Sequence, residues 1–218
     1  MQLSWFKHTA ATVAALLCAA LLAMHPALAH PHVWVTVETE VVFDANKAIT
    51  GFKHKWTFDE AYSAFAVDGR DTNGDGKYDR EELKELAEVN INTLKEFEYF
   101  TYPRYSGLVL DRLPPKDYWL EHHEDKLTLL FTLPLAKPLA LAQIKAFSFA
   151  VYDSTFYVDF ALAKEKPITL SSAPVGCVPE VKGPAAQSTS QSLLGSANTP
   201  DDGAAQYANS VRILCPAL

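Results

Sequence analysis

The sequence is poor in cysteine, in methionine and in clustered basic residues. Its 218 residues include three cysteines and two methionines, and no stretch concentrates lysine and arginine. So few cysteines exclude a small disulfide-rich scaffold. The missing basic cluster and a formal net charge of -7 argue against nucleic acid or an anionic membrane surface as a partner. Gly-x-Ser-x-Gly, His-Glu-x-x-His and glycine-rich phosphate loops are also absent, so no motif predicts an enzyme.

Long apolar runs are missing too, except near the N-terminus. Lys7 precedes an unbroken apolar stretch at 13–24, and Ala-Leu-Ala follows at 27–29. This order is typical of a signal peptide with a cleavage site after residue 29. The run is shorter than the roughly 20 apolar residues that cross a bilayer. We therefore expect residues 1–29 to be removed, leaving a periplasmic protein without membrane insertion.

Two cysteines, Cys177 and Cys215, remain after this processing. In an oxidising compartment such a sparse pair predicts one disulfide, worth about 4 kcal/mol by the chain-entropy estimate. A redox or metal pair is the weaker alternative, because no Cys-x-x-Cys is present. The stretch 171–209 is rich in Ser, Ala, Pro and Gly, which predicts a long loop or partly disordered tail.

The middle of the chain alternates between strand and helix patterns. Period-two alternation at 33–43 and a return at 49–56 predict a hairpin, and similar strands are expected at 118–120, 127–133, 147–151 and 156–162. Strand ladders separated by short turns favour antiparallel pairing. We therefore predict an α+β fold, mainly an antiparallel sheet, with one domain at 30–171 and a loop-rich tail at 172–218.

A helical insert interrupts these strands at 58–98. Thr57 and Glu60 fit a capping box that would start a short helix ending near Val67. A second, amphipathic helix is expected over 83–97, with apolar residues at 83, 86, 87, 94 and 97 and a break at Asn90.

Between the two expected helices, residues 71–82 match the twelve-residue EF-hand calcium loop. Calcium takes six to eight oxygen ligands, and Gly76 permits the sharp turn. Residues 59–98 hold twelve acidic and five basic residues, so most of the net acidity surrounds this loop. A calcium-free acidic loop is the alternative. The expected ligands are Asp71, Asn73, Asp75, the Lys77 carbonyl, Asp79 and Glu82.

The N-terminus left by processing is a second candidate metal site. It would read His30-Pro31-His32, which places an α-amine and two imidazoles within three residues. Such a set suits Cu²⁺, Ni²⁺, Co²⁺ or Zn²⁺. Pro31 has no N–H, so chelation through deprotonated backbone amides is blocked. The alternative is a frayed terminus followed by an exposed strand.

Three other histidines are candidates for additional metal ligands: His54, His122 and His123. His54 shares a strand face with Phe52 and Trp56, which favours a core histidine. His122 and His123 fall in an expected acidic turn at 121–125, which favours a solvated turn over a chelating pair.

Several stretches within 30–180 together resemble a known family. They are the start at 30–35, the segment 56–65, the calcium loop, and shorter pieces at 100–102, 127–131 and 151–153. The family comprises bacterial periplasmic proteins of unknown function, often labelled the periplasmic component of an ABC-type transport system. The resemblance implies an accessory role beside a nickel/cobalt or zinc transporter of the inner membrane, with His30 and His32 at the family's His-Pro-His positions.

Three hypotheses follow from the sequence. The leading one is a periplasmic calcium-binding protein that is also a metal-binding accessory of a transition-metal transporter. The second is an interaction module stabilised by calcium alone. The third is a copper enzyme in which His30 braces the metal, although the sequence shows no substrate pocket for it.

Overall fold

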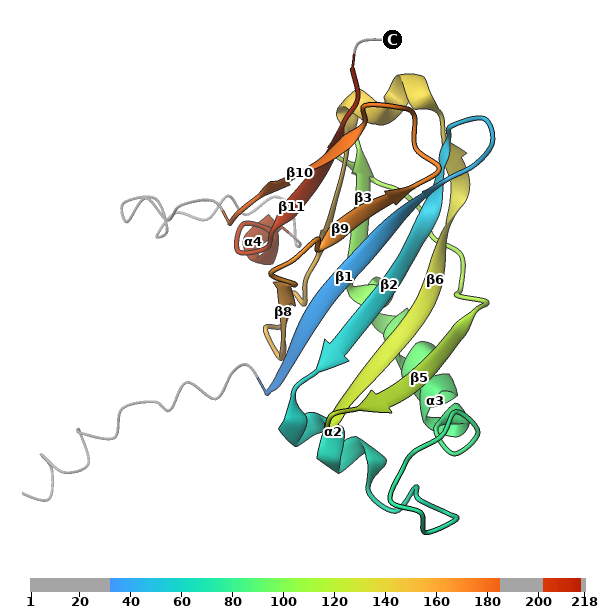
Figure 1. Cartoon of the computed structure of the whole chain (residues 1–218). Helices are drawn as coiled ribbons and strands as arrows, with labels where there is room; N and C mark the ends of the chain where they lie inside the picture. Colours follow the sequence, from blue (N-terminus) through green and yellow to red (C-terminus); the bar gives the residue numbers. More distant parts are fainter. Residues whose placement is uncertain (1–31, 185–201, 217–218) are drawn as a thin grey trace, which may run out of the picture. The chain divides into compact units, whose positions relative to one another are not determined.

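The computed structural model describes residues 32–184 and 202–216, which form two β-sheets with a short helical segment at one end (Figure 1). Strands predominate and most of them pair antiparallel, so the predicted α+β class is confirmed. The expected signal peptide, and His30 with it, lie outside the described residues.

The first sheet has the strand order β5-β6-β2-β1-β8, and β9 also pairs with β1. Along β1 every second side chain is buried, as the alternating sequence predicts. The turn after β1 returns the chain as β2, so the expected hairpin is confirmed. The strands are β1 (Val33–Phe43), β2 (Ile49–Phe58), β5 (Tyr118–His123), β6 (Lys126–Leu139), β8 (Val158–Leu162) and β9 (Ile168–Ser171).

The second sheet has the order β10-β11-β7-β3-β4. It contacts the first sheet through aromatic side chains, since the Phe52 ring lies 4.9 Å from that of Phe149 and 6.4 Å from that of Phe147. Both sheets thus contribute to one hydrophobic core. Its strands are β3 (Thr101–Tyr105), β4 (Leu108–Val109), β7 (Phe147–Val151), β10 (Val178–Lys182) and β11 (Ser210–Leu214), with a 3₁₀ turn η2 (Leu141–Ala146) before β7.

The strands at 147–151 and 156–162 do not form the antiparallel pair that their spacing predicts. β7 joins the second sheet, whereas β8 pairs parallel to β1 in the first, as does β9. The physical reason is that the chain leaves one sheet at Val151 and enters the other, so the turn at 153–156 connects two sheets rather than two neighbouring strands.

The helical insert lies between β2 and β3. It contains α2 (Glu60–Val67), α3 (Lys84–Leu94) and a 3₁₀ segment η1 (Lys95–Phe100). The predicted capping residue was wrong: Asp59 caps α2 by accepting from Tyr62 N (3.0 Å), while Thr57 still belongs to β2, its hydroxyl 3.1 Å from that of Thr128. The second helix is shorter than predicted because the backbone leaves helical geometry at 97–99.

The tail at 172–218 contains more regular structure than its composition suggests. β10 pairs with β11, and β11 pairs with β7, which incorporates the chain's last described segment into the second sheet. A short helix, α4 (Asp202–Ala205), precedes β11. The predicted Cys177–Cys215 disulfide is confirmed. It links the residue before β10 to the residue after β11, at one end of this antiparallel pair.

Candidate functional site

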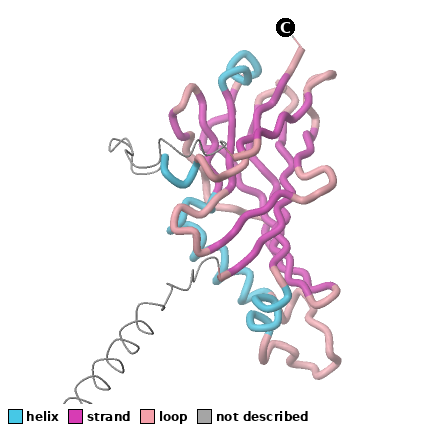
Figure 2. The backbone as a smooth tube through the Cα atoms, turned by 90° about the vertical axis from the view of Figure 1, so that its left-hand side faces the viewer, coloured by secondary structure: helices cyan, strands magenta, loops and turns pink. Residues whose placement is uncertain are grey.

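The loop at 71–82 lies beyond the strands at one end of the domain, between α2 and α3 (Figures 1 and 2). The Asp71 carboxylate accepts hydrogen bonds from the backbone N–H groups of Gly74 (2.8 Å), Asp75 (3.2 Å) and Gly76 (2.9 Å). Asn73 accepts from Asp75 N, and Asp75 accepts from Lys77 N, both at 2.8 Å. These short-range bonds fold the first half of the loop around its own side-chain oxygens.

Gly76 is explained by its backbone conformation and not by a lack of space for a side chain. Its φ is +75°, in the left-handed region that favours glycine. A Cβ placed there would meet nothing within 4 Å. The turn geometry therefore explains this glycine, as the EF-hand motif predicts.

The second half of the loop is organised by Asp79 and Glu82. Asp79 Oδ1 accepts from Glu81 N (2.9 Å) and Glu82 N (3.0 Å), so this carboxylate caps the turn leading into α3. Glu82 accepts from Asp79 N (3.1 Å) and from Thr72 N and its hydroxyl (2.8 and 2.9 Å). The N–H of Asp79, then the Thr72 hydroxyl, lower the pKa of Glu82, so its carboxylate is ionised at neutral pH.

The oxygen chemistry of this loop fits calcium, but its ligands are not gathered around one point. Among residues 32–184 and 202–216, no three His, Cys, Asp or Glu side chains are grouped so as to hold a metal ion. Glu82 instead spans the loop to Thr72 and Asp79. A bound calcium ion would therefore share the Glu82 carboxylate with these hydrogen-bond donors or displace them.

The exit side of the loop docks on β5. The Tyr78 ring lies 4.8 Å from that of His122, edge to face. The Arg80 guanidinium lies 4.7 Å from the Trp119 ring centre and pairs with Glu121 at 3.4 Å. The loop and the β5–β6 turn also border a cleft of about 560 Å³. These contacts connect the loop to the edge of the first sheet.

His122 and His123 are strand residues, which corrects the predicted turn at 121–125. They pair with Leu127 and Lys126 of β6, and only residues 124–125 form the turn. Successive strand residues face opposite sides of a sheet, so the two imidazoles do not converge.

His54 is buried in the core, as its strand position predicts. Its Nδ1 lies 3.0 Å from the Thr39 hydroxyl and its Nε2 lies 3.3 Å from that of Thr101, so both nitrogens have partners. Burial lowers the pKa of His54 to about 3, because the charged imidazolium is not solvated there. This histidine is neutral at physiological pH.

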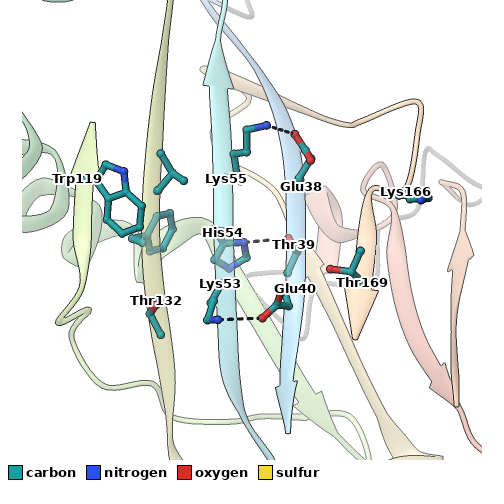
Figure 3. Close-up of a pocket in the computed structure, with 12 residues that line it drawn as sticks. Glu38, Thr39, Glu40, Lys53, His54, Lys55, Trp119, Thr132, Lys166 and Thr169 are labelled. Atoms are coloured by element: carbon teal, nitrogen blue, oxygen red, sulfur yellow. Dashed lines mark hydrogen bonds and ion pairs between the residues drawn. The ribbon is translucent and has the colours of Figure 1, made fainter. Parts of the chain in front are cut away.

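On the opposite, outer face of the sheet, cross-strand ion pairs flank His54 (Figure 3). Lys53 pairs with Glu40 at 3.1 Å and Lys55 with Glu38 at 2.8 Å, across β1 and β2. They border a depression of about 220 Å³ that Trp119 and Lys166 also line. Because the two lysines are already paired with carboxylates, this surface has no concentrated charge to attract an ion.

The N-terminal metal site is only partly within the described residues. His32 is exposed, and its ring lies 4.9 Å from that of Tyr157, while its backbone N–H donates to the Tyr157 carbonyl (2.9 Å). His30 lies outside the described residues. The metal site that His30 and His32 would share therefore stays a prediction.

Sequence analysis missed an apolar cavity of about 470 Å³ between the first sheet and α3. Trp56 and Leu129 line it from the sheet, Asn90 and Leu94 from α3, and Tyr157 from the loop before β8. The one signal that could have found it was Asn90, the polar residue that interrupts the apolar face of the helix.

Comparison with known proteins identifies the family. Residues 15–215 match the family described as "Protein of unknown function (DUF1007)". The chain belongs to this family. One relative is an uncharacterised protein of Haemophilus influenzae, 30% identical over 151 residues, which cover 69% of this chain and 71% of the relative. Another is an uncharacterised 15.5 kDa protein in the trpE 3' region of Spirochaeta aurantia, 32% identical over 100 residues, which cover 46% and 70%.

The family match confirms the resemblance to a family of unknown function and assigns no activity to the site. No described helix is long and apolar enough to cross a membrane.

Proposed function

We propose that this protein is a periplasmic calcium-binding protein whose loop at 71–82 holds one Ca²⁺. The observation that supports the proposal is the loop itself: six EF-hand ligand positions lie between two helices, with Gly76 in the required left-handed conformation. All the candidate donors are oxygens, as Ca²⁺ prefers. The carboxylates of Asp71, Asp75, Asp79 and Glu82 would supply negative charge to balance the ion.

Calcium bound here would stabilise the edge of the first sheet. Ser63 of α2 accepts a hydrogen bond from Leu127 N of β6 (2.9 Å), and Arg80 at the other end of the loop contacts β5 through Trp119. Helix α2, which precedes the loop, and Arg80 near the end of the loop are thus both attached to the β5–β6 hairpin. Fixing the loop would restrain α2, α3 and this hairpin together.

The wider role that we propose is a metal-binding accessory component of a transition-metal transport system. Its support is the His30-Pro31-His32 sequence and the resemblance to periplasmic components of transport systems beside nickel/cobalt or zinc transporters. The partner would be an inner-membrane transporter, and the cargo Zn²⁺, Ni²⁺, Co²⁺ or Cu²⁺. In this role the protein binds and transfers an ion and catalyses no reaction.

The alternative is an interaction module that calcium stabilises without transition-metal chemistry. The partners of two other histidines favour it: both ring nitrogens of His54 lie beside hydroxyl groups, and the His122 ring packs against Tyr78.

Calorimetric titration of the exported protein, whose first residue is established by mass, distinguishes these roles. Ca²⁺ binding that EGTA reverses supports the calcium proposal, and its absence would contradict it. Stoichiometric binding of Zn²⁺, Ni²⁺, Co²⁺ or Cu²⁺ that is lost on replacing both His30 and His32 with alanine supports the transport role. Calcium binding without any transition-metal binding favours the interaction module. As a control, replacing His123 with glutamine should leave all titrations unchanged.

A further inference from the structure

We propose that the cavity between the first sheet and α3 binds an uncharged hydrophobic small molecule, which accepts hydrogen bonds from Trp56 and Asn90 through an oxygen such as a ketone or ester carbonyl. This site is separate from the calcium loop, and the proposal does not depend on calcium or transition-metal binding.

The size and walls of the cavity suit such a molecule. Its volume of about 470 Å³ lies within the range of small-molecule sites. Aromatic rings dominate the wall: Phe160 lies 4.9 Å from Trp56 and 5.2 Å from Phe100, measured between ring centres. Phe58 and Tyr62 form a further ring pair at 4.7 Å on the same cavity. Such a surface favours an apolar or aromatic body.

Two residues that line the cavity each have a buried side-chain donor without a hydrogen-bond partner within residues 32–184 and 202–216. The donors are the indole Nε1 of Trp56 and the amide Nδ2 of Asn90. Trp56 is 1% exposed, so water does not satisfy its N–H from outside. An unpaired buried donor costs free energy, and buried polar groups normally have partners. Both atoms are donors, so the missing partner must be an acceptor.

A neighbouring residue shows that this fold can provide hydrogen-bond partners for polar side chains buried as fully as Trp56. His54 lies two positions before Trp56 on the same face of β2, and both its ring nitrogens have hydroxyl partners. By contrast, Trp56 and Asn90, which line the cavity, each keep a donor without a partner in the described part of the chain. This contrast indicates that the missing acceptor belongs to a bound molecule.

The charges around the cavity specify an uncharged ligand. No Lys, Arg or His is among the described residues that line it, so a carboxylate or phosphate would be desolvated without a counter-ion. The only lining carboxylate is that of Asp153, which accepts from Thr155 N and its hydroxyl (both 2.8 Å) and from Val158 N (3.0 Å). Because this carboxylate is already satisfied and buried, it offers little to a cationic ligand.

The probe for this site is 6-propionyl-2-(dimethylamino)naphthalene, a neutral fluorescent ketone whose emission reports both polarity and hydrogen bonding to its carbonyl. We expect the full chain, purified as the cell processes it, to bind this ketone at one site with blue-shifted emission. Trp56→Phe keeps an aromatic ring and removes one donor, so it should weaken binding roughly 3- to 10-fold, as expected for one neutral hydrogen bond. The matched control is Trp119→Phe, because Trp119 lies outside the cavity and donates to Glu121; it should not change the affinity.

Competitors separate hydrogen bonding from apolar burial. In the wild type, 2-acetylnaphthalene should displace the probe at a roughly 3- to 10-fold lower concentration than 2-ethylnaphthalene, which lacks the carbonyl. Asn90→Leu, on the helix, should reduce this preference and provides an independent test where Trp56→Phe fails to fold. The anionic probe 1-anilinonaphthalene-8-sulfonate should not compete.

Three results would overturn the proposal. They are absence of ketone binding to the folded wild type, equal displacement by the ketone and the hydrocarbon, and unchanged affinity in both Trp56→Phe and Asn90→Leu. Calcium titration of the same preparations keeps the two sites distinguishable, since none of these results concerns the loop at 71–82.

Discussion

The loop at 71–82 and the apolar cavity differ in how their polar groups are hydrogen-bonded. In the loop, solvent-facing oxygens such as those of Asp71 and Glu82 accept hydrogen bonds from N–H groups at most ten residues away. In the cavity, the donors of Trp56 and Asn90 are buried and have no partner in the described part of the chain. Polar groups therefore stabilise the fold in one region and reduce its stability in the other.

A ligand would therefore affect hydrogen bonding differently in the two regions. The loop organises itself through its backbone, and an ion would share its carboxylates with donors that already bond to them or displace those donors. The cavity has a wall contributed by α2, α3, η1, four strands of the first sheet and a connecting loop. In our proposal its unpaired donors gain a partner from a molecule that enters. Substitutions of polar residues should consequently destabilise the protein in the loop and stabilise it in the cavity.

The largest expected effect concerns Glu82. At a calcium concentration 100-fold above the dissociation constant, calcium should raise the free energy of unfolding by about 2.7 kcal/mol, and Glu82→Gln should abolish most of this gain. Glu81→Gln is the matched control, because Glu81 is largely exposed and pairs only with Lys84. Urea unfolding with calcium and with EGTA measures both. Equal losses in the two variants would show that calcium does not use Glu82.

The next largest effect tests a buried polar group that does have partners. The pKa of His54 is about 3 in the folded protein, against 6.5 in the unfolded chain. Between these values the unfolded state binds the extra proton, so stability is highest above pH 6.5 and falls as the pH falls towards 3. The slope is at most about 1.4 kcal/mol per pH unit.

His54→Gln removes this titration. Lowering the pH from 7 to 5.5 should destabilise the wild type by about 1 kcal/mol more than this variant. Urea unfolding at the two pH values measures the difference. Parallel behaviour of the wild type and His54→Gln would contradict a buried neutral His54.

A smaller effect of opposite sign is expected at Asn90. Asn90→Leu removes an unpaired buried donor and should stabilise the protein by about 1 kcal/mol in the absence of ligand. Asn92→Leu on the same helix is exposed, so it controls for helix propensity. Thermal unfolding of the three proteins compares them. If Asn90→Leu is no more stable than Asn92→Leu, the unpaired donor has no measurable cost.

The smallest effect concerns the contact between the loop and β5. Arg80→Gln removes an exposed ion pair with Glu121 and a cation–π contact with Trp119, so it should cost about 0.5–1 kcal/mol. Lys84→Gln removes only the exposed pair with Glu81 and should cost less. Urea unfolding at low and at high salt measures both, and the ion-pair part should shrink at high salt. A larger effect of Lys84→Gln would contradict docking through Arg80.

Local patterns in the sequence predicted the elements that local physics governs. The alternation from Val33 to Phe43 predicted β1 with its correct bounds, because burial of every second side chain is a property of one strand. Cys177 and Cys215 predicted the disulfide, since no other pair was available. Choosing Thr57 over Asp59 as the helix cap was an error of two residues, and it arose because β6 extends the pairing of β2 through Thr57.

Features that depend on pairing with strands far away in the sequence could not be predicted from local patterns. The turn at 153–156 gave no sign that it connects two sheets, and the composition of the tail concealed β10 and β11, which β7 holds in the second sheet. His122 and His123 were placed in a turn because only pairing with β6 makes them strand residues.

The sequence by itself determined the loop at 71–82, where the Asp71 and Glu82 carboxylates accept hydrogen bonds from residues of the same loop. Tertiary structure alone decided the cavity and the hydrogen bonding of His54. Thr39, His54 and Thr101 meet across two sheets, and Trp56 and Asn90 line one cavity from a strand and a helix. The physical reason is that a short loop is shaped by its own backbone, whereas a buried polar group is satisfied or left unpaired by whatever the rest of the chain places beside it.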